Sequence, residues 1–162
     1  MNNLKIDKHV INVIVENQFG VLAQIAGMFS SRGYNISSLI VGETEDPKIS
    51  LMTITVEGNE EIVEQVIKQL NKQINVIKVI NLTNQDYVAR ELALVKVSAN
   101  KQNRHKIVTV VQAMGGEVIE ITKSFVFAEF TGDEDKVENA VQLIKSYGIK
   151  EMIRTGKVAL LK

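Results

Sequence analysis

The stretch VENQFGVLAQIAGMFSSRGYNI, residues 15–36, decides the predicted fold of this chain. It opens as the end of a strand and passes through a tight turn at residues 17–20. Apolar residues then recur at the spacing of one helical face, at Leu22, Ile25, Ala26 and Phe29. Gly33 follows where the end of a helix favours a left-handed residue, and Asn35 opens the next strand. The pattern therefore predicts a strand, a helix and a second strand joined by two tight turns.

The turn at residues 17–20 is the first candidate for a binding site. The first turn of a helix presents backbone N–H groups without an intrahelical partner, together with the positive end of the helix dipole. Small anions suit that position. Gly20 has no Cβ to block a ligand and tolerates a positive φ. The same glycine would suit a tight strand-to-helix connection without any ligand, and the spacing leaves both interpretations open.

The elements on both sides of this stretch repeat one order twice. In the first half, apolar periodicity predicts helices from Gly20 and over 60–73, and strands over 10–16, 35–41, 49–57 and 75–83. In the second half it predicts helices over 103–114 and 133–147, and strands over 91–98, 117–121, 124–131 and 149–154. The order βαββαβ is that of a ferredoxin-like sandwich, with helices on one face of an antiparallel sheet. The sequence therefore predicts an α+β protein of two tandem domains, 1–84 and 85–162, with a polar linker at 84–87.

Charge and cysteine content exclude several classes of protein. The 162 residues include 19 Lys and Arg and 19 Asp and Glu, so no net field attracts nucleic acid or an anionic membrane. The absence of cysteine excludes disulfides, thiolate metal ligands and a cysteine nucleophile, and gives secretion no support. No apolar run is long enough for a signal peptide or a membrane span, so we expect a cytoplasmic protein. Each half is about 80 residues long, a size at which folding buries only a modest fraction of the surface, so we expect an oligomer.

Motifs for catalysis, nucleotides and metals are missing from the sequence. It contains no G-x-S-x-G and neither glycine-rich nucleotide fingerprint. His9 and His105 have no partner at metal-ligand spacing, and both are predicted to be surface residues. The basic run KQNRHK at 101–106 opens a helix, where positive charge is mildly unfavourable, and it indicates either a solvated loop or a site for a phosphate or a partner. An RNA-binding module of the same topology is disfavoured, because the strands predicted over 10–16 and 49–57 carry no aromatic residue on which a base could stack.

Four segments carry a resemblance to a known family. They are ENQFGVLAQIAGMFSSRGYNISSL, MTITVEG, VARELALVKV and RTGKVAL, and they extend from the first predicted strand almost to the end of the chain. Together they resemble the small, regulatory subunit of acetolactate synthase. The resemblance implies that domain 1–84 is an ACT domain, which binds an effector and dimerises, and that 85–162 is a second ferredoxin-like domain.

The same resemblance implies a function without catalysis by this chain itself. Members of the family bind a catalytic large subunit that uses thiamine diphosphate, magnesium and FAD, and this chain is expected to bind none of these cofactors. They activate that subunit and confer feedback by valine or another branched-chain amino acid. The choice among these effectors stays open, since one methylene changes binding in an apolar pocket by only about 1–3 kcal/mol. The alternative is a free-standing ACT-type amino-acid sensor that controls another enzyme or a transcription factor.

The effector site that the resemblance implies lies at an interface between two ACT domains, so a homodimer is expected. The matching positions of this chain are Asn17, Gly20, Val21, Leu22, Asn35 and Ile36. Backbone amides from Gly20 onward would take the carboxylate of the effector. The side-chain amides of Asn17 and Asn35 offer both donors and acceptors, and Leu22 and Ile36 are candidates to line a pocket for a branched side chain.

Overall fold

The computed structural model describes residues 7–162, which form two compact units. The first unit contains the described residues up to Val88 together with Gly156–Lys162, and the second unit contains Ala89–Thr155. Residues 1–6 of the predicted first domain lie outside the described part of the chain. Among the helices of residues 7–162, none has the length and apolar character needed to cross a membrane.

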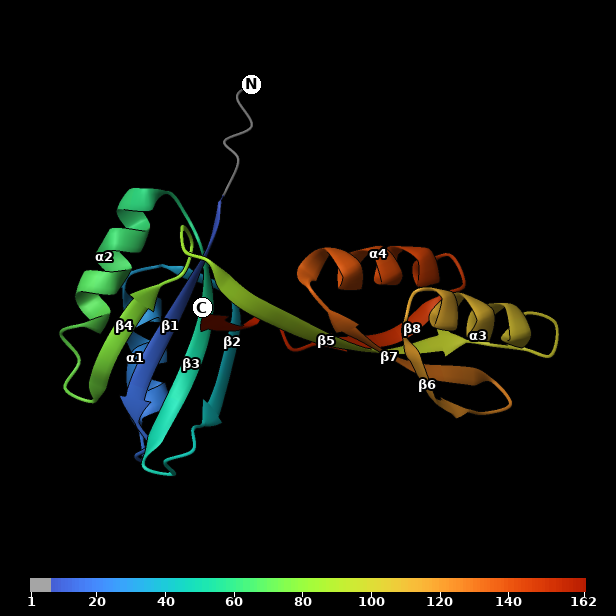
Figure 1. The fold of residues 1–162 in the computed structure, drawn as a ribbon, viewed down its shortest axis with the longest axis horizontal. Helices are drawn as coiled ribbons and strands as arrows, with labels where there is room; N and C mark the ends of the chain where they lie inside the picture. Colours follow the sequence, from blue (N-terminus) through green and yellow to red (C-terminus); the bar gives the residue numbers. More distant parts are fainter. Residues whose placement is uncertain (1–6) are drawn as a thin grey trace, which may run out of the picture. The chain divides into compact units, whose positions relative to one another are not determined.

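A four-stranded antiparallel sheet with two helices on one face forms the core of the first unit (Figure 1). Its elements in chain order are β1 (Lys8–Glu16), α1 (Val21–Ser31), β2 (Asn35–Glu43), β3 (Ile49–Glu57), α2 (Glu60–Leu70) and β4 (Val76–Asn81). The strand order is β2-β3-β1-β4, so β1 and β3 lie side by side in the centre. Side chains alternate along β1, and Ile11, Val13 and Val15 are buried in the core with residues of α1 and α2.

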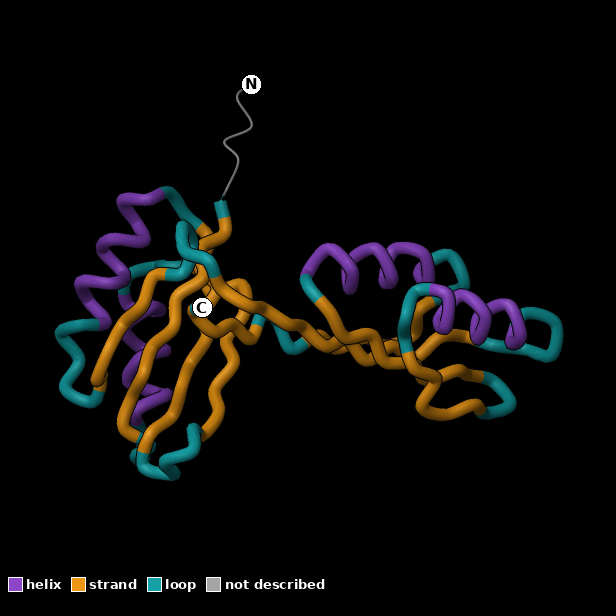
Figure 2. The backbone as a smooth tube through the Cα atoms, viewed as in Figure 1, coloured by secondary structure: helices purple, strands orange, loops and turns teal. Residues whose placement is uncertain are grey.

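The second unit repeats this architecture (Figure 2). It has a hydrophobic core of its own. Its elements are β5 (Tyr87–Ser98), α3 (Arg104–Ala113), β6 (Glu117–Ile121), β7 (Phe125–Gly132), α4 (Glu134–Lys145) and β8 (Ile149–Arg154). The strand order β6-β7-β5-β8 matches that of the first sheet, element for element. Gly116 is required where the chain passes Phe130, because a Cβ at this position would lie 2.5 Å from the ring. The prediction of two ferredoxin-like sandwiches is confirmed, and β5 begins inside the segment predicted as a linker.

The last strand, β9 (Val158–Leu161), is one that the sequence patterns do not predict. It pairs with β5, and residues 156–162, which we call the tail, belong to the first unit, whereas the predicted boundaries assigned them to 85–162. Asn12 Nδ2 donates to Ala159 O over 2.8 Å, and Thr53 Oγ1 donates to Asn12 Oδ1 over 2.9 Å. Asn12 alternates with the core residues of β1, so it points to the helix-free face of the sheet. The tail therefore covers part of that face.

His9 is buried, and the surface position predicted for it is wrong. Its exposed fraction is 6%, and its Nε2 lies 3.0 Å from Gly58 O, so a main-chain hydrogen bond satisfies the ring. The prediction rested on the neighbouring Lys8, but successive side chains of a strand point to opposite faces, so a charged neighbour does not place a histidine in solvent. His105 is exposed on α3, as predicted.

Candidate functional site

The predicted carboxylate-binding turn joins β1 to α1. Gly20 has φ 85° and ψ −11°, in the left-handed region that glycine adopts without strain. No protein atom outside its chain neighbours lies within 4 Å of the position that a Cβ of Gly20 would occupy, so this side of the turn is open. Helix α1 has neither a side-chain cap nor an acidic residue in its first turn. In α2, by contrast, the Asn59 side chain accepts a hydrogen bond from Ile62 N at 2.9 Å. The first amide of α1, that of Val21, donates to Gln18 O over 3.4 Å within the turn, so an acceptor that is not a capping side chain would meet the amides after it.

Asn17 ties the turn to the loop between β2 and β3. Its Nδ2 donates to Glu43 Oε1 over 3.0 Å and to Pro47 O over 2.9 Å. An amide nitrogen has two protons, and both are used here. The side chain of Asn17 can therefore offer a ligand the acceptor Oδ1 but no donor. Of the two roles that the sequence allows for this amide, only that of acceptor remains, and an acceptor suits an ammonium group.

The apolar residues predicted around the turn differ in exposure. Val21 is 3% exposed and belongs to the core, and its backbone N–H donates to Gln18 O over 3.4 Å, so neither its side chain nor its N–H is left open to a ligand. Leu22 is 46% exposed, and Ile36 is half-buried against the core at the start of β2. Phe19, which the sequence patterns do not single out, is fully exposed within the turn itself. Its position inside the candidate turn is the one signal by which it could have been found.

Asn35 opens β2 and is held by a carboxylate of the neighbouring strand. Its Nδ2 donates to Glu57 Oε2 over 2.9 Å, and Ser37 Oγ donates to Glu57 Oε1 over 2.6 Å. These hydrogen bonds, with that of Ser37 the stronger influence, hold the pKa of Glu57 below its ordinary value. One of the two protons of Asn35 Nδ2 is thus used in a hydrogen bond within the chain.

The turn and Asn35 lie at opposite ends of the first sheet. Along β3, Ile49 pairs with Glu16 beside the turn, whereas Glu57 pairs with Asn35. These positions of β3 are eight residues apart, which at about 3.4 Å per residue corresponds to about 27 Å. A single chain therefore does not bring Asn17 and Asn35 to the same small ligand.

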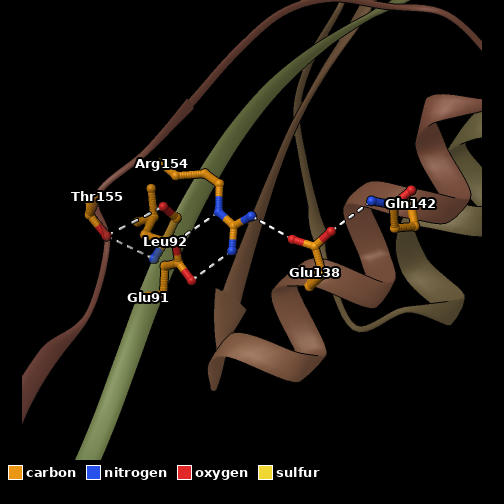
Figure 3. A network of polar contacts seen from close by, with 6 residues as sticks. All are labelled: Glu91, Leu92, Glu138, Gln142, Arg154 and Thr155. Atoms are coloured by element: carbon orange, nitrogen blue, oxygen red, sulfur yellow. Dashed lines mark hydrogen bonds and ion pairs between the residues drawn. The ribbon is translucent and has the colours of Figure 1, made fainter. Parts of the chain in front are cut away.

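A second polar cluster lies in the second unit, where β5 and β8 run side by side (Figure 3). Arg154 binds Glu91 through two hydrogen bonds, Nε to Oε1 at 2.8 Å and Nη2 to Oε2 at 2.9 Å, and binds Glu138 Oε2 through Nη1 at 2.6 Å. The hydrogen bonds that Arg154 donates to Glu91 raise its pKa, the one that it donates to Glu138 adds to the effect, and the guanidinium stays charged. Gln142 donates to the other oxygen of Glu138 over 2.7 Å. The cluster joins the segments VARELALVKV and RTGKVAL, and its groups are occupied with one another, so it is a structural clamp.

Other candidates from the sequence are also engaged in local structure. Within residues 7–162, no group of three or more His, Asp or Glu side chains could hold a metal ion. In the basic run 101–106, Arg104 Nη2 donates to Lys123 O over 2.9 Å, and Asn103 Oδ1 accepts from Asn100 N at 2.7 Å. These contacts stabilise the turn that precedes α3, which favours the solvated-loop interpretation of that run.

Both units have counterparts among known proteins. Two family models match the chain: the AHAS small subunit-like ACT domain over residues 11–78, and the small subunit of acetolactate synthase over residues 90–162. The probable acetolactate synthase small subunit of Archaeoglobus fulgidus is 49% identical over 155 residues, which cover 96% of this chain and 97% of that protein. The acetolactate synthase small subunit of Bacillus subtilis is 42% identical over 157 residues, covering 96% and 91%. The crystal structure of the small subunit from Thermotoga maritima matches with a TM-score of 0.87 and 34% identity, over 97% of this chain and 98% of that one.

Proposed function

This chain belongs to the family of acetolactate synthase small subunits, and from that premise we propose that it is the non-catalytic regulatory subunit of an acetolactate synthase. The observation that carries the proposal is the match of both units to the family over nearly the whole chain. The partner would be a catalytic large subunit that holds thiamine diphosphate, magnesium and FAD, and this chain would bind none of the three. The cytoplasm is the compartment that goes with this role.

A second copy of the chain would complete the effector site. Strand β2 lies at the edge of the first sheet, so its outer side can pair with another strand. If two copies pair β2 with β2 antiparallel about Leu39, the middle residue of the strand, Asn35 of one copy lies opposite Glu43 of the other. Because Glu43 is bonded to Asn17, Asn35 of the second copy would then reach the turn that Asn35 of the same chain does not reach. Such a homodimer would carry two equal sites.

A branched-chain amino acid fits the groups that this pairing assembles. Its carboxylate would accept hydrogen bonds from the amides at the start of α1, beside Gly20, and its ammonium would donate to Asn17 Oδ1. Its side chain would lie near Leu22 of one copy and Ile36 of the other. We propose valine as the effector, with leucine and isoleucine as the nearest competitors. The bound effector would inhibit by favouring one state of the holoenzyme over another, which requires a difference in its affinity for the two states.

Reconstitution with the native partner tests this function. Affinity capture of the tagged chain from its source should retain a large thiamine-diphosphate enzyme, and mixing the two should raise acetolactate formation and make it sensitive to valine. The purified chain alone should form no acetolactate, and turnover by it would contradict the non-catalytic assignment. Capture of an unrelated enzyme or a transcription factor, with no large subunit, would favour the free-standing sensor instead.

A further inference from the structure

The side-chain amide of Asn17 is held in one orientation by two acceptors. Its Nδ2 donates to Glu43 Oε1 over 3.0 Å and to Pro47 O over 2.9 Å. An ionised carboxylate and a main-chain carbonyl can only accept hydrogen bonds. A half-turn of the amide would therefore replace two hydrogen bonds by two contacts between acceptors. Oδ1 is thus the one polar atom of this side chain that remains for a ligand.

The backbone on both sides of this contact is also fixed. Asn17 N donates to Lys48 O over 2.7 Å, next to Pro47 in the same loop. Glu43 is the last residue of β2 and pairs with Ser50 of β3, so the register of the sheet sets its position. Of the two acceptors, only that of Glu43 belongs to a side chain. Glu43 is therefore the residue at which a substitution can release the amide.

An acceptor at this point of the site distinguishes ligands by the group on their α-carbon. Valine and α-ketoisovalerate, the keto acid with the same carbon skeleton, share the carboxylate and the branched side chain. The amides of α1 and the apolar residues Leu22 and Ile36 therefore cannot distinguish them. An ammonium donates to Asn17 Oδ1, whereas a keto oxygen only accepts and would leave both oxygens without a hydrogen bond.

We propose that Glu43 is a specificity-determining residue of the effector site, which orients the Asn17 amide so that the site binds an amino acid and rejects the keto acid. The inference rests on the effector site proposed above and deepens it. The charge of Glu43 acts in the same direction, because a carboxylate attracts an ammonium. Asn35 does not impose the same choice, since the hydrogen bond to Glu57 uses only one proton of its Nδ2.

Three variants of the full chain test this role. Glu43→Ala removes both the acceptor and the charge, and Glu43→Gln removes the charge but keeps an acceptor oxygen. Glu45→Ala is the matched control, because it removes a charge from an exposed residue of the same loop, whereas the hydrogen bonds of the Asn17 side chain go to Glu43 and Pro47. Calorimetry gives the dissociation constants for valine and for α-ketoisovalerate, and their ratio is the readout. If leucine or isoleucine binds more tightly than valine, it and its own keto acid take the place of this pair.

The ratio should depend on the acceptor at residue 43. The parent chain and Glu45→Ala should bind valine at least about tenfold more tightly than the keto acid, because the keto acid leaves an acceptor unsatisfied. In Glu43→Ala one proton of Asn17 Nδ2 is released and can donate to a keto oxygen, so the ratio should fall about tenfold. Glu43→Gln should keep most of the ratio, because its amide oxygen can accept the same hydrogen bond. Circular dichroism checks that each variant is folded.

Several outcomes would overturn this role of Glu43. A purely structural role in the loop would weaken both ligands alike in Glu43→Ala and leave the ratio unchanged. A ratio that falls as far in Glu43→Gln as in Glu43→Ala would assign the choice to charge instead of orientation. Equal binding of valine and the keto acid by the parent chain would overturn the inference and leave the effector site in place. If the parent chain binds none of these ligands, the proposed effector site fails together with the inference.

Discussion

The Gly20→Asp variant should lose its response to the effector while the chain stays folded. Gly20 adopts φ 85°, which costs a non-glycine residue about 1–2 kcal/mol, but no neighbouring atom lies within 4 Å of the added Cβ, so backbone strain is the main cost. The matched control is Gly20→Asn. It has nearly the same size and the same backbone strain, and it lacks the charge. Any difference between the two variants therefore reports the carboxylate alone.

The size of that difference follows from the position of the new charge. A carboxylate at residue 20 would stand about 5 Å from a carboxylate bound at the first amides of α1. With an effective dielectric constant between about 20 and 80, the repulsion is about 1–3 kcal/mol, which weakens effector binding about five- to two-hundredfold. The lower end of this range applies if the site stays wet, and the upper end applies if a second copy closes over it.

Two assays measure the effect. Calorimetry on the small subunit gives the dissociation constant for valine, and a valine titration of the reconstituted holoenzyme gives the inhibition, which the Asp variant should lose while activation of the large subunit persists. Equal valine affinity in Gly20→Asp and Gly20→Asn would refute the carboxylate-binding turn. Loss of folding or of dimerisation in both variants would return Gly20 to the role of a tight-turn residue.

Three further predictions concern stability. Glu91→Gln should lower the free energy of unfolding by about 1–3 kcal/mol, measured by urea denaturation, because Arg154 loses a buried carboxylate; an unchanged midpoint would show that the clamp adds nothing. Removal of residues 157–162 should destabilise the first unit by about 1–3 kcal/mol, because the buried amide of Asn12 loses its acceptor, and hydrogen exchange of β1 should rise; unaltered exchange there would contradict this. Because the pKa of Glu57 is lowered in the folded chain, its ionised carboxylate adds to the free energy of unfolding above the ordinary carboxyl pKa. This contribution is lost as the pH falls through the lowered pKa. Between about pH 6 and pH 3, Glu57→Gln should therefore lose less stability than the parent chain, and equal losses would argue against this role.

Local patterns were enough to predict most of the fold. Helices α1, α3 and α4 end near the glycines where the patterns end them, and α2 begins after Asn59 because its capping residue and the acidic residues of its first turn are adjacent in the sequence. Strand β9 could not be found in this way, since it has four residues and its tail is fixed by Asn12, 147 residues away in the sequence. The burial of His9 likewise depends on Gly58, a partner that no local pattern names.

The candidate site could be predicted only in part, for a related reason. The turn with Gly20 is local, and its open left-handed conformation follows from residues 17–20 alone. That Asn35 lies about 27 Å away along β3 depends on strand register, which the residues of the turn do not specify. The engagement of both Asn17 donors depends on Glu43 and Pro47, which lie at the end of β2 and in the loop after it, far from Asn17 in the sequence.

The helix-free faces of the two sheets have the same place in the fold but different surface chemistry. The face of the first unit carries a buried polar pair, Asn12 and Thr53, and a buried amide donor needs an acceptor close above it. A main-chain carbonyl supplies that acceptor at Ala159, so a segment of extended chain is a suitable cover there. The helix-free face of the second sheet has no such need at its centre, because Lys96 and Glu151 already form an ion pair there. The buried polar pair of the first face thus accounts for the tail that covers it, and the ion pair of the second face makes an acceptor of this kind unnecessary there.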